Sequence, residues 1–88
     1  MALFVVSYDL VARKDYPTLT ERLEEMNSVR ALASMWLVDV DSTAEEVKNN
    51  LRGYIDEDDR LMVIEFSERP KWTLALKGTR QWVKARFG

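Results

Sequence analysis

The chain has 88 residues and a formal net charge of −2, and it contains neither cysteine nor histidine. These absences exclude disulfides, thiol catalysis, histidine-based catalytic triads and zinc held by cysteine, so any bound metal would be a hard ion such as Mg²⁺ or Mn²⁺ on carboxylates. No apolar run approaches the roughly 20 residues that span a bilayer and no signal peptide is visible, so we expect one soluble, cytoplasmic domain over residues 1–88 with no membrane partner.

The chain begins with an apolar run that predicts a buried strand at residues 3–8. β-Branched and aromatic residues fill this run, which ends in Ser7, Tyr8 and Asp9. A carboxylate at the end of a central strand can hold a metal ion, or it can accept backbone hydrogen bonds from the next loop. Asp9 is therefore the candidate catalytic and metal-binding residue, with a structural role as the alternative.

Pro17 predicts the start of a helix, because proline favours the first helical turn and keeps the preceding residue extended. Leu19, Leu23 and Met26 recur at helical spacing, and the polar pair at residues 27–28 ends the helix. Two β-like runs follow, separated at residues 33–34. They predict either a hairpin with a very tight turn or one long bent strand, since the turn lacks glycine, asparagine and aspartate.

A capping box predicts the start of a second helix. Ser42 with Glu45 supplies one register of this motif, and Thr43 with Glu46 supplies another; we take Ser42 as the N-cap. Gly53 marks the expected end of this helix. The acidic residues 56–59 that follow lack the ligand spacing of an EF-hand and predict a solvated turn.

Residues 60–66 predict another strand, and their nearly continuous apolar run predicts cover on both faces. The last 22 residues predict a short strand, in which Trp72, Leu74 and Leu76 alternate, and then a helix capped by Thr79. The resulting order predicts an α+β, ferredoxin-like βαββαβ sandwich with a C-terminal strand/helix extension. Two helices would cover one face of the sheet, and a second copy or the tail would cover the other.

Charge is unevenly distributed along the chain. Residues 67–88 contain six basic residues and one acidic residue, a net charge of +5, whereas residues 1–66 carry −7. A basic tail with interleaved aromatic residues is typical of a nucleic-acid interface, and also of core or dimer contacts surrounded by basic side chains. The candidate nucleic-acid-binding residues of this tail are Lys77, Arg80 and Lys84.

Several short motifs carry a resemblance to a known family. They are Tyr8-Asp9, Arg30 and Ser34 ahead of Trp36-Leu37-Val38, the run Ser42-Thr43-Ala44-Glu45-Glu46, and the run Asp58-Asp59-Arg60-Leu61-Met62-Val63. Through them the chain resembles the small ferredoxin-like family of the second CRISPR-associated adaptation protein. It resembles even more closely the bacterial and phage relatives labelled SinR-like, whose later pattern is matched by Trp72 and Trp82-Val83-Lys84.

The resemblance implies a homodimer in which Asp9 of both subunits lies near the dimer axis. Such a pair can hold Mg²⁺ or Mn²⁺ for phosphodiester hydrolysis, and some members of the family are nucleases of RNA or DNA, whereas others are scaffolds that hold duplex DNA. Arg13 falls in a loop where the family often has basic residues and Lys14 adjoins it, so both join the candidate nucleic-acid-binding residues. Ser34 matches a serine near the second strand.

Three functional hypotheses follow from these observations. The first is a homodimeric, nucleic-acid-associated protein that binds RNA or DNA without cutting it. The second is a Mg²⁺- or Mn²⁺-dependent endoribonuclease or deoxyribonuclease that uses paired Asp9 side chains. The third is a protein-interaction module of phage or mobile-element origin.

Overall fold

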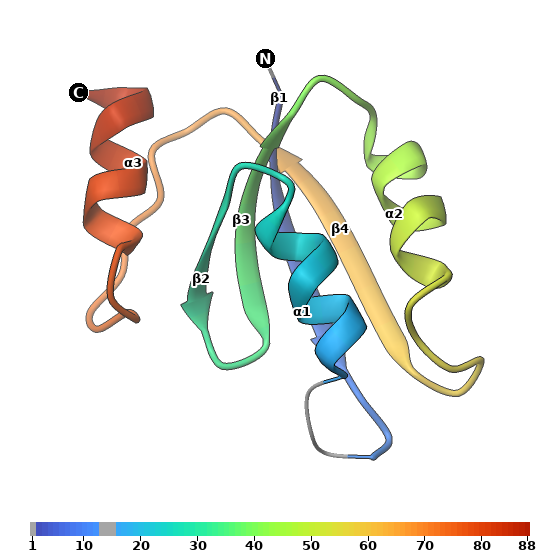
Figure 1. The fold of residues 1–88 in the computed structure, drawn as a ribbon. Helices are drawn as coiled ribbons and strands as arrows, with labels where there is room; N and C mark the ends of the chain where they lie inside the picture. The colour runs from blue at the N-terminus through green and yellow to red at the C-terminus, as the bar shows by residue number, and fades with distance from the viewer. Residues whose placement is uncertain (1, 13–15) are drawn as a thin grey trace.

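A computed structural model describes residues 2–12 and 16–88, which form a four-stranded sheet and three helices (Figure 1). The strands are β1 (Ala2–Asp9), β2 (Ser28–Leu32), β3 (Met35–Val40) and β4 (Arg60–Phe66), and the helices are α1 (Pro17–Glu24), α2 (Ala44–Arg52) and α3 (Thr79–Phe87). The sheet has the order β2–β3–β1–β4, and every neighbouring pair is antiparallel. This topology confirms the ferredoxin-like α+β fold expected from the sequence.

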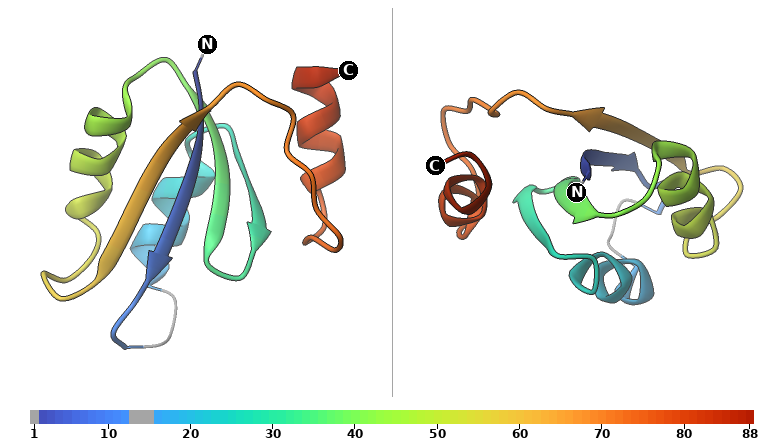
Figure 2. Two further views of the ribbon diagram at one scale, coloured as in Figure 1. Left: turned by 180° about the vertical axis from the view of Figure 1, so that it is seen from behind. Right: turned by 90° about the horizontal axis from the view of Figure 1, so that it is seen from above.

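One face of the sheet is covered by α1 and α2 (Figure 2). Alternate residues of β1, namely Phe4, Val6 and Tyr8, point to this face and are buried there. Leu19 and Leu23 of α1 are completely buried against them, as the helical spacing predicted. The remaining buried members of this first core are Leu10, Met26, Trp36, Val38, Val47 and Leu51.

The opposite face is covered in part by α3, which lies beside β2 (Figure 2). Its buried Trp82 and Val83 pack on the sheet, and the Phe66 and Phe87 rings stack with their centroids 6.3 Å apart. The buried members of this second core are Leu3, Ala31, Leu37, Trp82 and Val83. The tail therefore supplies part of the cover that the sequence led us to expect.

The expectation that β4 is covered on both faces is wrong for this chain. Met62 is 63% exposed and Ile64 is also exposed, although Leu61 and Val63 pack against the first core. The reason is geometric, because α3 packs over β2 and the neighbouring strands and leaves the middle of β4 uncovered.

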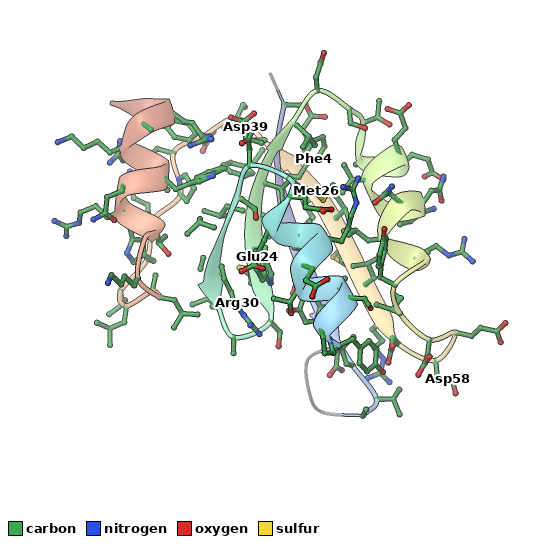
Figure 3. All side chains as sticks on the ribbon, viewed as in Figure 1. Phe4, Glu24, Met26, Arg30, Asp39 and Asp58 are labelled. Carbon is green, nitrogen blue, oxygen red and sulfur yellow. The ribbon has the colours of Figure 1, made fainter. Side chains whose placement is uncertain are left out.

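Polar contacts fix the position of α3 on the sheet. The Arg86 Nε donates to Asp39 Oδ2 at 2.7 Å, and the side chains of this ion pair are only 17% and 13% exposed. The same guanidinium lies 4.1 Å from the centroid of the Trp82 ring, and Trp82 Nε1 donates to the Asn27 carbonyl at 3.0 Å. Figure 3 shows Asp39 on the side of the sheet that faces α3. Such nearly buried, charge-assisted contacts hold α3 against the sheet.

The turn between β2 and β3 confirms the hairpin and rules out the long bent strand. Neither Ala33 nor Ser34 has a positive φ, so the turn is not of the usual glycine-dependent type. Instead, the pairing shifts between Arg30 and Leu32, and Arg30 Nε donates to the Ala33 carbonyl at 3.0 Å. A β-bulge and a side-chain contact thus replace the missing turn residues.

Two predicted helix caps differ from those in the structure. The N-cap of α2 is Thr43, whose hydroxyl accepts from the Glu46 N–H while the Glu46 carboxylate accepts from the Thr43 N–H, so the Ser42–Glu45 register is wrong and the alternative is confirmed. The N-cap of α3 is Gly78, with φ of 96°, instead of Thr79. Thr79 is buried and donates its hydroxyl proton to the Leu76 carbonyl at 2.7 Å.

The strand predicted around Trp72, Leu74 and Leu76 is not formed in the structure. Leu76 N donates to the Ala31 carbonyl at 2.8 Å, which gives the segment one backbone hydrogen bond to the outer edge of β2. Leu74 is 85% exposed, so the alternating pattern does not correspond to a buried face. The C-terminal extension therefore contributes the expected helix but not the expected strand.

Candidate functional site

Asp9 is the last residue of β1. It lies on the same face of the sheet as α3. The pairing register places it opposite Arg60 of β4, and Arg60 Nη1 donates to Asp9 Oδ2 at 2.9 Å. Both side chains are largely exposed, at 70% for Asp9 and 83% for Arg60. An exposed ion pair of this kind contributes little to stability, typically about 0–1 kcal/mol.

The described residues around Asp9 do not form a metal site. Among residues 2–12 and 16–88, no group of three or more acidic side chains is arranged to hold a metal ion. Hard cations such as Mg²⁺ need several oxygen ligands, and one exposed carboxylate supplies at most two. The described residues of one chain therefore do not complete a metal site at Asp9.

An apolar strip lies beside Asp9 on the same face of the sheet. In the strand register, Val5 pairs with Ile64 and Ser7 pairs with Met62. The next pair on the same side of the sheet is Asp9 with Arg60. Because the period of a strand is two, these residues project to the same side. The exposed Met62 and Ile64 thus extend from the Asp9–Arg60 pair toward the partly covered second core.

The structure brings two of the predicted nucleic-acid-binding residues together. Arg80 and Lys84 are four residues apart in α3 and line one groove of about 500 Å³. Lys77 is exposed just before α3 and does not line this groove, whereas Arg13 and Lys14 lie outside the described residues.

This groove, which we call the tail groove, is formed between residues 69–73 and α3. Figure 3 shows nitrogen-tipped side chains that project from α3 away from the sheet. Arg69 and Lys71 were not among the candidate residues chosen from the sequence, although they belong to the basic tail of net charge +5 in which aromatic and basic residues interleave. The lining residues are Arg69, Pro70, Lys71, Trp72, Thr73, Arg80, Lys84 and Gly88.

The acidic run at residues 56–59 has a structural role that the sequence did not reveal. Asp59 accepts from the backbone N–H of Val11 at 2.7 Å and of Asp56 at 2.8 Å, and the Tyr16 hydroxyl lies 3.3 Å from its carboxylate. Loss of hydration opposes ionisation, but these hydrogen bonds outweigh it and hold the pKa of Asp59 below its ordinary value. Loss of hydration, together with the neighbouring carboxylates, raises the pKa of Tyr16 to about 12.

Ser34 lies in the exposed β2–β3 turn, where its carbonyl accepts from Tyr8 N at 3.1 Å. Tyr8 is buried, and its hydroxyl accepts from Trp36 Nε1 at 3.1 Å. Both motif residues therefore have contacts that account for them structurally.

No helix within the described part of the chain is long and apolar enough to cross a membrane.

Comparison with known proteins places the chain in a family. No solved structure matches the chain. The sequence matches the family model of CRISPR associated protein Cas2 over residues 1–73, a range that contains all four strands together with α1 and α2 and ends before α3. The chain therefore belongs to the Cas2 family of CRISPR-associated proteins and is a protein related to CRISPR adaptation.

Proposed function

We propose that the chain forms a homodimer that binds RNA or DNA and does not cut it. The observation that carries this proposal is the tail groove, because three of its cations have no partner among the residues that the structure describes. Within the described residues, the side chains of Lys71, Arg80 and Lys84 take part in neither an ion pair nor a hydrogen bond. Such unpaired cations suit phosphate groups, and their attraction to phosphate is the main source of affinity for nucleic acids.

The Asp9–Arg60 ion pair supports binding without cleavage. Two Asp9 carboxylates brought together across a dimer axis would repel each other, and a divalent metal would relieve that repulsion. Arg60, with its nitrogen 2.9 Å from Asp9, already supplies a compensating charge within each chain. A metal ion would also meet the repulsion of two guanidinium groups, so the pairing disfavours a shared metal.

The apolar strip supports the homodimer. Met62 and Ile64 form an exposed apolar surface in the middle of a sheet face that is otherwise partly covered. Exposed patches of this kind are typical of interfaces, and a twofold axis joins the same patch on two copies. A Met62→Glu change would place two like charges in the interface. We expect it to shift the molar mass measured by light scattering from dimer to monomer, whereas Leu74→Glu, at an exposed position away from the strip, leaves the mass unchanged.

Hydrolysis by paired Asp9 side chains with Mg²⁺ or Mn²⁺ is the second candidate function. It is favoured by the position of Asp9 beside the apolar strip, since a dimer formed through that strip would have Asp9 of both copies next to the interface. The Asp9–Arg60 pair is exposed, so a metal could displace Arg60 at modest cost in free energy.

A cleavage assay with an Asp9→Asn variant distinguishes the two functions. Labelled RNA and duplex DNA are incubated with each protein in Mg²⁺ and in Mn²⁺, and binding is measured in parallel without metal. We expect binding by both proteins and cleavage by neither. Cleavage by the wild-type protein that disappears in Asp9→Asn, with binding unchanged, would establish the nuclease and overturn the non-catalytic proposal.

Salt dependence tests the binding itself. If Lys71, Arg80 and Lys84 each contact a phosphate, affinity for duplex DNA should fall about 40-fold per subunit between roughly 50 and 200 mM salt. The double variant Arg80→Ala/Lys84→Ala should flatten this dependence. A wild-type protein that binds neither nucleic acid at low salt would leave the protein-interaction hypothesis in its place.

The proposal also includes two narrower assignments. We propose that residues 1–88 form one domain, since α3 is joined to the sheet by the buried Arg86–Asp39 pair. We also propose that the SinR-like proteins are the nearer relatives, on the strength of Trp72 and the α3 residues, of which the latter lie beyond the matched range 1–73. Limited proteolysis checks the first assignment, because a separate α3 would be removed well before the sheet is cleaved.

A further inference from the structure

The tail groove contains one aromatic side chain among its cations. Trp72 is 38% exposed, so its indole is held by the protein on part of its surface and open to solvent on the rest. It also lines a small, largely apolar hollow of about 100 Å³ beside Ala31, Leu32 and Met35 of the β2–β3 hairpin. The other two tryptophans, Trp36 and Trp82, are buried and each donates its indole N–H within the protein. Trp72 is thus the tryptophan that can contact a ligand.

The charges around Trp72 come from two directions. Lys71 precedes it in the chain, and Arg80 and Lys84 lie across the groove on α3. Arg69 Nη1 donates to the Gly88 carbonyl at 2.7 Å, so this guanidinium is already occupied in holding the end of α3 beside residues 69–73. Three cations without a partner among the described residues therefore surround one partly exposed indole, and the lining of the groove contains no acidic side chain.

The exposed indole in the groove favours an unpaired nucleotide over a duplex. The groove, at about 500 Å³, has room for a ligand of that size. Bases inside a duplex are stacked on their neighbours, so their faces are not available to an indole, whereas an unpaired base can turn out and stack on an aromatic side chain.

We propose that the tail groove binds single-stranded nucleic acid, with Trp72 stacking on an unpaired base and Lys71, Arg80 and Lys84 contacting the flanking phosphates. The inference rests on the proposed nucleic-acid binding and narrows it to one class of ligand at one place on the molecule. It places the binding of single strands at the tail groove, away from Asp9 and the apolar strip.

Fluorescence anisotropy on the full chain tests the proposal with two probes, a labelled oligothymidylate and a blunt DNA duplex of the same length. Trp72→Ala should weaken binding of the single strand roughly 5- to 150-fold, which is the stacking contribution of about 1–3 kcal/mol per base expressed as a ratio of affinities. Binding of the blunt duplex should change less than about twofold, since a duplex offers no free base face. Trp72→Phe, which retains an aromatic ring, should restore most of the affinity for the single strand.

Two matched controls separate the groove from its surroundings. Leu74→Ala removes an exposed apolar side chain two residues from Trp72 and outside the groove lining, and it should leave single-strand binding unchanged. Lys77→Ala removes one positive charge outside the lining, so it should reduce single-strand affinity less than Lys84→Ala does. Circular dichroism confirms that each variant is folded.

Quenching of tryptophan fluorescence provides an independent readout that needs no destabilising change. Oligothymidylate should quench the emission of the wild-type protein, and Trp72→Phe should abolish this quenching while binding persists. Unchanged single-strand affinity in Trp72→Ala, or quenching that survives in Trp72→Phe, overturns the groove assignment and leaves duplex binding and the proposed function intact. A wild-type protein that binds neither probe overturns both.

Discussion

The two faces of the sheet are covered in different ways. Two helices, α1 and α2, bury a continuous core on one face, whereas a single nine-residue helix, α3, covers part of the other. The first face lies entirely within the part of the chain that matches the family model, and α3 lies outside it. The core between the sheet and α1 and α2 therefore lies within the matched range, whereas the tail groove and the exposed strip of β4 lie on the other face of the sheet.

The largest expected effect concerns the first face. Phe4 is completely buried at the centre of β1, and Phe4→Ala should lower the free energy of unfolding by about 3–5 kcal/mol because it leaves a cavity. Urea denaturation measures this loss. On the other face, Met62→Ala should change the free energy of unfolding of the monomer by less than about 0.5 kcal/mol, since this side chain is already exposed. Similar values for the two variants would contradict the contrast between the faces.

A smaller effect is expected where α3 meets the sheet. Asp39→Ala removes the carboxylate that accepts from Arg86 in a nearly buried ion pair, and it should cost about 1–3 kcal/mol. The loosened helix should also expose Trp82, which a red shift in tryptophan emission would report. If stability and emission both stay at their wild-type values, α3 is not held by this pair.

The cap of α2 gives an effect of about 1 kcal/mol. Thr43→Ala removes the hydroxyl that accepts from the Glu46 N–H, and a lost N-cap usually costs about 0.5–2 kcal/mol. Ser42→Ala is the matched control, because Ser42 donates to the Glu46 carboxylate but does not cap the helix. Thermal denaturation of both variants should show the larger loss for Thr43→Ala, and the reverse order would favour the Ser42 register.

The smallest expected effect is a pH dependence of stability that comes from the Asp59 carboxylate. The folded state lowers the pKa of Asp59, so the ionised carboxylate stabilises the fold above the pKa of the unfolded chain, near 3.8. This contribution is lost as the pH falls through the lower pKa of the folded state. Urea titrations between neutral and acidic pH should show a shallower loss of stability for Asp59→Asn than for the wild-type protein, and parallel curves would contradict the assignment.

Periodic patterns predicted the first face well. The spacing of Leu19 and Leu23, the Pro17 start and the apolar run of β1 each specify local structure by a rule that burial then reinforces. The capping box was ambiguous because Ser42 and Thr43 both satisfy the motif, and only the backbone geometry at Thr43 selects between them. Local sequence could not make that selection.

The second face was harder to predict because its cover depends on contacts between distant parts of the chain. The alternation of Trp72, Leu74 and Leu76 satisfies a strand rule, but only Leu76 finds a backbone partner at the edge of β2. The candidate site was predicted in part, since Arg80 and Lys84 were identified by charge. Their convergence with Lys71 and Trp72 depends on how residues 69–73 pass beside α3, and spacing in the sequence does not encode that path.

The position of β4 at the end of the sheet order has a consequence for handling the protein. β2, at the opposite end, receives the Leu76 N–H on its outer side, whereas no other strand or loop of the described residues pairs with the outer backbone groups of β4. Arg60 and Glu65 place charges along this strand, which is a common defence against sheet-to-sheet growth into fibrils. Neutralising Glu65, by mutation or by acid, removes one of those charges and should make β4 the first place at which a concentrated solution begins to aggregate.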